Sequence, residues 1–295
     1  MNPVKIAADS CIDLPKESRE RYDIDYLKMN IMCCGGFVPH DLDWQHMDPD
    51  VFYARLRRGD CFIPEKVSPA ATEQFFTQYL SRGFDVVFVA CSGKLSQGIT
   101  VARETAVRLQ KQFPQASVFC VDSLNVGAGE GALAIAAAKL RDEGKSAAEI
   151  AKMLCERRNR VNLFAMTDNL TPLIRANRIN LKSAHVGNLL DIKTIIISDS
   201  EGNIVPLKSV RGRNRAMEAL VRLAAGSIEF PETQTVLIRH SDCSDDANAM
   251  AQMMMRRIPA ADVHVGTMSP VIGASVGANA LSIAVEGKDV RRFIV

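Results

Sequence analysis

Residues 85–98 read DVVFVACSGKLSQG, and this stretch decides the fold. Its first half is an apolar run rich in β-branched residues. A strand with one solvent-exposed face would alternate apolar and polar residues, so this continuous run predicts an inner strand of a parallel sheet. Apolar residues then recur at helical spacing from Ile99 to Phe113. The stretch therefore predicts a strand followed by a helix, with small hydroxyl residues at the junction, where open α/β sheets bind ligands.

Two further apolar strands end in the same kind of residue pair. Residues 4–8 lead into Asp9-Ser10, and residues 116–121 lead into Asp122-Ser123. We expect these pairs and Ser92 to share one rim of the sheet, because the carboxyl ends of parallel strands lie at one edge. Each pair taken alone is more typical of residues that only cap a turn or a helix, and it is the recurrence at three strands that favours a shared site.

The composition is that of a globular protein with a large core. The chain has 295 residues, of which 47% are hydrophobic, and its formal net charge is only +2, from 36 basic and 34 acidic side chains. This balance indicates neither a nucleic-acid partner nor a membrane surface. Eight cysteines without a secretory signal or a long apolar run predict a cytoplasmic protein with free thiols and no integral membrane segment.

The usual cofactor motifs are absent from the sequence. It contains neither a phosphate-binding P-loop nor a dinucleotide-binding glycine fingerprint after a strand. The cysteines form no Cys-x-x-Cys pair, and the five histidines form no helical pair. We therefore expect no cofactor and no metal site. The glycines at 127, 129 and 131 fit close helix packing as well as they fit a ligand.

The order of elements predicts an α/β protein with two domains and a ligand between them. Residues 1–159 are expected to form a doubly wound parallel-sheet domain, with strands 4–8, 26–32, 85–91 and 116–121 and helices 15–22, 49–57, 71–81, 97–112, 127–143 and 147–159. Residues 160–295 are expected to form an α/β domain with a mixed sheet, with strands 161–166, 192–198, 203–210, 234–240 and 261–267 and helices 169–175, 181–190, 212–225 and 244–257. Residues 201–203, Glu-Gly-Asn, indicate a hairpin in that sheet.

One functional interpretation is a transferase or hydrolase of small molecules. Asp9 and Asp122 would then act as acid and base beside Ser96 at the polar rim. Such an enzyme needs an open polar cleft, whereas a lipid carrier needs an enclosed apolar cavity.

A second interpretation comes from motifs spread along the whole chain. These are ADSCIDLP at 8–15, VSP at 67–69, CSGKLSQ at 91–97, VDS at 121–123, NLTPLIRANRI at 169–179, LLDIK at 189–193 and IGASVGANA at 272–280. In order and spacing the chain resembles the DegV family of bacterial fatty acid-binding proteins. The resemblance implies two α/β domains with a long-chain fatty acid between them, and a separate ATP-dependent kinase subunit that phosphorylates the bound acid for phospholipid synthesis.

The resemblance also implies which residues meet the ligand. Ser96 and the backbone amide of Gln97 match the positions that bind the fatty acid carboxylate, Ser68 matches a loop serine, and Arg178 matches the arginine of a Gly-Gly-Arg-Ile turn. The chain departs from the family at several positions, and around Ser96 the usual glycine and threonine are replaced by Gln97 and Gly98. Val67 replaces the usual threonine and Ser275 the usual histidine.

The predicted polar set is therefore Ser68, Ser92, Ser96 and Ser275, with Asp9, Ser10, Asp122, Ser123 and Val67 as further rim residues.

Overall fold

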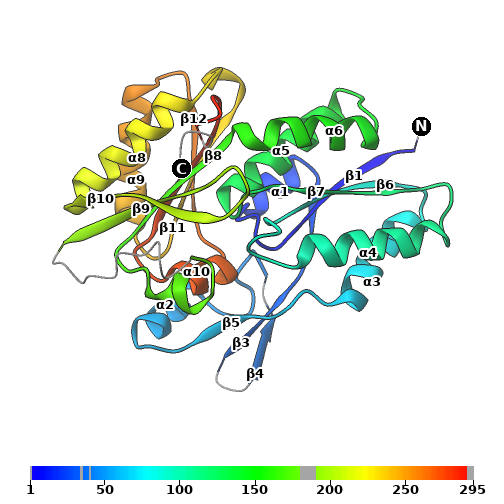
Figure 1. The fold of residues 1–295 in the computed structure, drawn as a ribbon, viewed down its shortest axis with the longest axis horizontal. Coiled ribbons are helices and arrows are strands. Elements are labelled where there is room, and N and C mark those ends of the chain that lie inside the picture. The colour runs from blue at the N-terminus through cyan, green and yellow to red at the C-terminus, as the bar shows by residue number, and fades with distance from the viewer. Residues whose placement is uncertain (1, 34–35, 40, 180–190, 291–295) are drawn as a thin grey trace.

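Three sheets organise the part of the chain that the computed structural model describes, residues 2–33, 36–39, 41–179 and 191–290 (Figure 1). The first sheet is parallel, as predicted, in the order β2 (Ile24–Leu27), β1 (Val4–Asp9), β6 (Asp85–Ala90) and β7 (Val118–Asp122). Because β1, β6 and β7 are neighbours, the three strand ends predicted to share a rim do lie side by side.

Alternate residues of β6 face opposite layers of helices, which explains why the whole strand is apolar. Val86, Phe88 and Ala90 pack on one side in a core shared with α3 (Pro69–Leu80) and α4 (Gly98–Gln110). Val87 and Val89 pack on the other side with α5 (Ala128–Asp142) and α6 (Ala147–Arg157). The short helix α1 (Lys16–Arg21) follows β1.

The second sheet is mixed, also as predicted. Its strands lie in the order β10 (Ile204–Arg211), β9 (Ile192–Ser198), β8 (Val161–Thr167), β13 (Leu281–Glu286), β11 (Thr235–His240) and β12 (Asp262–Thr267). Only β11 and β12 pair in parallel among these strands. The hairpin signal at Glu201–Asn203 is confirmed, since it joins the antiparallel strands β9 and β10. The inner strand β13 is absent from the elements predicted from the sequence.

Helices α8 (Arg213–Ser227) and α9 (Ser244–Arg257) cover the outer face of this second sheet, on the left of Figure 1. Its inner face meets α5, which also packs on β1 and β6 of the first sheet. Small residues make this double contact possible. A Cβ atom on Gly131 would lie 2.5 Å from the carbonyl oxygen of Ile12, so close packing accounts for this glycine. The two larger sheets therefore share one core across α5.

The third sheet projects at the bottom of Figure 1 and was not predicted. It is antiparallel, in the order β4 (Gly36–Pro39), β3 (Asn30–Cys33) and β5 (Phe62–Pro64). The single strand expected at 26–32 is wrong: β2 ends at Leu27 and β3 begins at Asn30, and each joins a different sheet. Helices α2 (Pro49–Arg57), α7 (Thr171–Arg175) and α10 (Pro270–Val276) lie nearby.

Two short 3₁₀ turns, Arg158–Arg160 and Pro231–Thr233, complete the regular elements of the described residues. The helix predicted at 181–190 lies outside them. Within the described ranges, no helix combines the length and the apolar character needed to cross a membrane. The predicted division after residue 159 stays a prediction, and it falls just before β8.

Candidate functional site

A cavity of about 510 Å³ lies where the two larger sheets meet the small third sheet. Its volume is within the usual range for sites that bind small molecules, about 300 to 1,000 Å³. Most of its wall is apolar and comes from both halves of the chain: Met29, Val67, Leu95, Val126, Leu163, Ala165, Leu173, Ile196, Ile204, Met268, Val271 and Ile272. In the second half of the chain, strands β8, β9 and β13 each contribute a residue to the wall: Ala165, Ile196 and Ser282. Ala165 lies between the other two, paired with Ile196 on one side and with Ser282 on the other.

Ser96 and Gln97 lie on the cavity wall at the start of α4. The Oγ atom of Ser96 accepts a hydrogen bond from the backbone N–H of Gly98 at 3.1 Å. A hydroxyl group has one donor and two acceptor positions, so the proton of Ser96 remains available to a ligand. In the part of the chain that the structure describes, no protein group accepts a hydrogen bond from the backbone amide of Gln97. Two hydrogen-bond donors are therefore available to an anion at this point of the cavity wall.

Val67 lines this end of the cavity and lies beside Gly98. A Cβ atom on Gly98 would lie 3.3 Å from the Oγ of Ser96, 3.4 Å from a methyl carbon of Val67 and 3.5 Å from a carboxylate oxygen of Asp9. Val67 therefore packs beside the serine, and an apolar surface stands where the resemblance implies a hydroxyl group. The residue shapes the polar end of the cavity without donating a hydrogen bond.

Ser275 also lines the cavity, on α10. Its hydroxyl group donates to the carbonyl oxygen of Val271 at 2.9 Å, one helical turn earlier. A serine hydroxyl has only one proton to donate. In this conformation Ser275 can accept a hydrogen bond from a ligand but does not offer it a proton.

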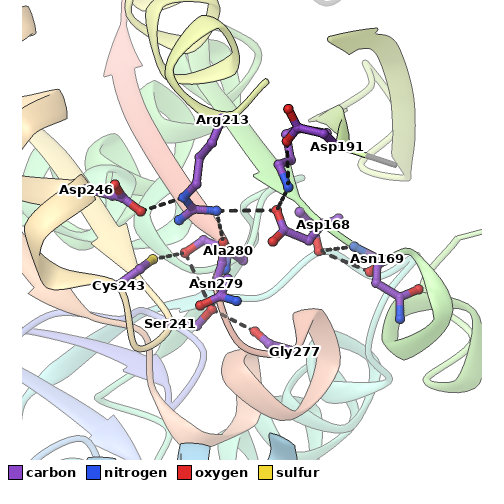
Figure 2. A network of polar contacts seen from close by, with 12 residues as sticks. Asp168, Asn169, Asp191, Arg213, Ser241, Cys243, Asp246, Gly277, Asn279 and Ala280 are labelled. Carbon is purple, nitrogen blue, oxygen red and sulfur yellow. Dashed lines mark hydrogen bonds and ion pairs between the residues drawn. The ribbon is translucent and has the colours of Figure 1, made fainter. Parts of the chain in front are cut away.

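A network of polar contacts fixes the turn that follows α10 (Figure 2). Ser241 donates to the carbonyl oxygen of Gly277 at 2.7 Å and accepts from the amide of Ala280 at 2.7 Å. Arg213, at the start of α8, donates to the carbonyl oxygen of Asn279 at 3.0 Å and forms ion pairs with Asp168 and Asp246. This network anchors α10, and with it Ser275, to the second sheet.

Arg178 lines the cavity just after α7 and is partly exposed. Asn177 before it has a left-handed backbone conformation, with φ of 55°. Asparagine tolerates this region better than most residues that carry a side chain, so it can stand where the resemblance implies a glycine. The turn thereby places Arg178 at the cavity wall.

Two predicted ligand residues lie outside the cavity wall. Ser68 is exposed and caps α3, where its Oγ accepts from the amide of Ala71 at 3.3 Å. Ser92 is buried and its hydroxyl group donates to the carbonyl oxygen of Gly202 at 2.8 Å. Gly202 belongs to the β9–β10 hairpin, and a Cβ atom there would lie 2.3 Å from the Ser92 oxygen. Ser92 therefore ties the second sheet to the first.

The rim carboxylates bind the backbone. The carboxylate of Asp9 accepts hydrogen bonds from the amides of Cys11 and Cys91, at 2.9 and 3.0 Å, and burial raises its pKa. Asp122 accepts from the amides of Gly93 and Leu124, at 3.3 and 3.0 Å. Neither carboxylate lines the cavity, so the structure does not place them as an acid–base pair around a substrate there.

The rim serines are likewise inside the protein. Ser10 is buried at the end of β1. The hydroxyl group of Ser123 donates to the carbonyl oxygen of Asn125 at 3.0 Å and accepts from the amide of the same residue at 3.1 Å. Ser123 thus stabilises a turn, which is the structural role that the sequence left open for it.

Sequence reasoning did not single out Asp13, a buried acid on the cavity wall. Its carboxylate accepts from the amide of Ser269 at 2.8 Å, and its own carbonyl oxygen accepts from the fully buried Arg239 at 2.6 Å. Burial raises the pKa of Asp13 to about 6, although Ser269 and Arg239 oppose the shift. Asp13 is the second aspartate of the ADSCIDLP motif, which was the available signal. Its partner Ser269 lies 256 residues away, and the sequence alone does not reveal that contact.

We expect an Asp13→Asn variant to flatten the pH dependence of stability. Because the pKa of Asp13 is raised in the folded state, the contribution of Asp13 to the free energy of unfolding is highest below about pH 4 and falls as the pH rises towards 6. A shift of about two pKa units corresponds to about 3 kcal/mol. The variant should therefore gain up to about 3 kcal/mol on the wild type between pH 4 and 7, as measured by urea unfolding. Parallel profiles for the two proteins would contradict the assignment.

Comparison with known sequences finds one family over nearly the whole chain. A family model described as "Uncharacterised protein, DegV family" matches residues 3–288. A DegV domain-containing protein of Clostridium perfringens is 29% identical, over 96% of this chain and 97% of that protein. Another, from Streptococcus pyogenes serotype M3, is 27% identical over 97% of this chain and 99% of that protein.

Solved structures share the fold. A DegV lipid-binding protein from Thermotoga maritima has a TM-score of 0.81 at 24% identity, over 98% of this chain and all of that one. A DegV family protein from Ruminococcus gnavus, described with vaccenic acid, has a TM-score of 0.86 at 15% identity, over 97% and 100%. A third, from Thermus thermophilus and described as binding fatty acid, has a TM-score of 0.84 at 22% identity, over 98% and 100%.

Proposed function

The chain belongs to the DegV family, and from this premise we propose that it binds a long-chain fatty acid in the cavity between its two larger sheets. The carboxylate would lie at the start of α4, against Ser96 and Gln97, and the hydrocarbon tail along the apolar wall. Vaccenic acid and other fatty acids accompany solved members of the family, which supports this ligand class.

The state of Ser96 is the observation that carries the proposal. Its oxygen already accepts from Gly98, which orients the hydroxyl group and leaves its proton for an acceptor in the cavity. A carboxylate receives charge-assisted hydrogen bonds from such donors and is favoured at the start of a helix. The neighbouring backbone amide of Gln97 adds a second donor. Together the two donors replace some of the hydrogen bonds that the carboxylate makes with water before it binds.

The tail would supply most of the binding free energy. Each buried methylene group contributes about 0.8 kcal/mol, and the wall offers methionine, leucine, isoleucine and valine side chains from both halves of the chain. Val67 and Ser275 offer no proton to a carboxylate, so the head group is held by fewer donors than the resemblance implies. We infer that the affinity for the fatty acid depends mainly on its hydrocarbon tail. Ser96 fixes the position of the carboxylate, and thereby how far the tail extends along the cavity.

The direct test of this proposal is native mass spectrometry of the protein purified without added ligand, followed by denaturation and identification of what is released. We expect a fatty acid at close to one per chain. A protein that is empty, and that stays empty after incubation with fatty acids of several chain lengths, would overturn the proposal.

A Ser96→Ala variant should weaken fatty acid binding by about 1 to 3 kcal/mol, because a hydrogen bond to a charged group is lost. Ser68→Ala is the matched control. Ser68 caps α3 outside the cavity, so its loss should lower stability by about 1 kcal/mol and leave affinity unchanged. Fluorescent fatty acid displacement measures both variants. Equal affinities for Ser96→Ala and the wild type would refute the carboxylate position.

We further propose that the chain is a carrier and that catalysis takes place on a separate ATP-dependent kinase subunit. In that reaction the bound carboxylate attacks the terminal phosphorus of ATP, giving an acyl phosphate and ADP. The sequence has no phosphate-binding P-loop. This supports the proposal that the chain binds the fatty acid and that a separate subunit binds ATP. The partly exposed Arg178 at the cavity wall is suited to stabilise the negative charge on the transferred group.

An Arg178→Ala variant should therefore impair acyl phosphate formation more than fatty acid binding. We expect a decrease of about 10- to 100-fold in the rate with a kinase partner, within the range for lost transition-state donors, and less than a threefold change in affinity. Phosphate transfer and ligand displacement are measured on the same preparation. Equal losses in both would show that Arg178 only binds the ligand.

A further inference from the structure

Two cysteines and a glutamate from three separate segments meet at the buried end of the first sheet. Cys11 follows β1, Cys91 follows β6 and Glu130 lies in the first turn of α5. The two sulfur atoms and a carboxylate oxygen of Glu130 all lie within 4.8 Å of one another, and all three residues are buried. Sulfur and carboxylate groups at this separation have the composition of a metal site.

Glu130 meets a second acid, and no cation or N–H donor among the described residues accounts for its carboxylate. The residue is 0% exposed. Its carboxyl group lies against that of Asp9, with which it shares a hydrogen bond, and among the described residues no N–H donor reaches its oxygens. Buried carboxyl groups are normally hydrogen-bonded, paired with a cation or bound to a metal ion. The side chain therefore places its polar end near the two sulfur atoms, where its hydrogen-bond partner is another carboxyl group.

Asp9 holds the two cysteines side by side. One of its carboxylate oxygens accepts from the amide of Cys11 and the other from the amide of Cys91. The loop after β1 and the loop after β6 are thereby fixed to each other through a single side chain. Metal ligands are commonly oriented by a second layer of hydrogen bonds of this kind.

We propose that Cys11, Cys91 and Glu130 bind a zinc ion. Two thiolates and one carboxylate suit a borderline-soft divalent cation that is tetrahedral, and zinc fits this ligand set better than magnesium or calcium, which prefer oxygen alone. Cys11 and Cys91 line the cavity, so the ion can reach the site through it. The fourth coordination position would be left for water or for a group in the cavity.

The test uses cobalt as a probe on the full-length chain, reduced and freed of metal with a chelator. Cobalt bound to two thiolates gives a thiolate-to-metal charge-transfer band and the strong visible bands of a tetrahedral site. We expect one cobalt ion per chain, displaced by one equivalent of zinc. Absence of the charge-transfer band in the folded wild-type protein would overturn the proposal.

Variants identify the ligands. Cys91→Ala and Glu130→Gln should each weaken zinc binding by about 100-fold or more, since each removes a ligand. Cys61→Ala and Cys155→Ala, which change exposed thiols, should leave binding unchanged. If Cys91→Ala does not fold, Cys11→Ser and Glu130→Gln decide the question. Binding that is lost with the exposed cysteines and kept in Glu130→Gln would mean adventitious thiol coordination and refute the site.

Protection from alkylation gives a second readout that does not depend on cobalt. Zinc should slow the modification of Cys11 and Cys91 by a small neutral alkylating reagent, measured by peptide mass spectrometry, and leave Cys61 and Cys155 as reactive as before. Equal rates with and without zinc at the two buried thiols would contradict the proposal.

Discussion

An Ala165→Phe variant is expected to lose fatty acid binding while it keeps the native fold. Ala165 is on β8, between Ile196 of β9 and Ser282 of β13, and all three line the cavity. A phenyl ring at this position would fill space that the proposed tail occupies. If it displaces about four methylene groups, the loss is about 3 kcal/mol, or more than 100-fold in affinity.

Ala165→Ser is the matched control, because it adds only one oxygen atom at the same position. Circular dichroism and thermal unfolding should show that both variants fold, since the ring projects into open space and not into packed side chains. Fatty acid displacement should then separate them. Unchanged affinity in Ala165→Phe would place the ligand outside this cavity and would remove the basis of the proposed function.

Replacement of Arg239 by methionine should cause the largest loss of stability that we expect from changing a single charged residue. Arg239 is fully buried on β11. Its guanidinium group donates to the carbonyl oxygens of Asp13, Ile238 and His264 at 2.6, 2.7 and 3.0 Å. Burial lowers its pKa to about 10, and the charge of Asp13 opposes that shift. Removal leaves those acceptors unsatisfied, which should cost about 3 to 5 kcal/mol.

Arg222→Met is the control for this substitution. Arg222 is on the exposed side of α8, where it pairs with Glu218 one turn earlier, and such surface pairs contribute about 0 to 1 kcal/mol. Urea unfolding at pH 7 measures both variants. A loss below about 1 kcal/mol for Arg239→Met would show that the buried hydrogen bonds contribute little net stability.

Strands β1, β6 and β7 of the parallel sheet could be predicted because they are largely apolar and each is followed by a helix. Strand β13 could not be recognised with the same ease. Its sequence, LSIAVE at 281–286, is a short apolar run that periodicity alone does not distinguish from a buried helical segment. The third sheet was missed for a different reason. Only two residues, Lys28 and Met29, separate β2 from β3, and tertiary pairing alone shows that the two strands enter different sheets.

The lining of the candidate site was predictable in part. Ser96, Gln97, Val67, Arg178 and Ser275 lie on the cavity wall, whereas Ser68 and Ser92 use their hydroxyl groups elsewhere. A serine at the end of a strand can serve a backbone group as well as a ligand, and the sequence does not show which way it points.

The cysteine and glutamate cluster was not predictable from spacing. Its members come from positions 11, 91 and 130, and only the fold brings these segments together, whereas motif rules rely on ligands that are close in sequence.

The position of α5 between the two larger sheets has a consequence for cooperativity. Neither sheet can lose its packing without exposing a face of this helix, because both bury side chains against it. The two halves of the chain should therefore unfold in one transition, with equal calorimetric and van't Hoff enthalpies. A fragment cut after residue 159 would retain α5 with one apolar face bare, so it should aggregate and not behave as an autonomous folding unit.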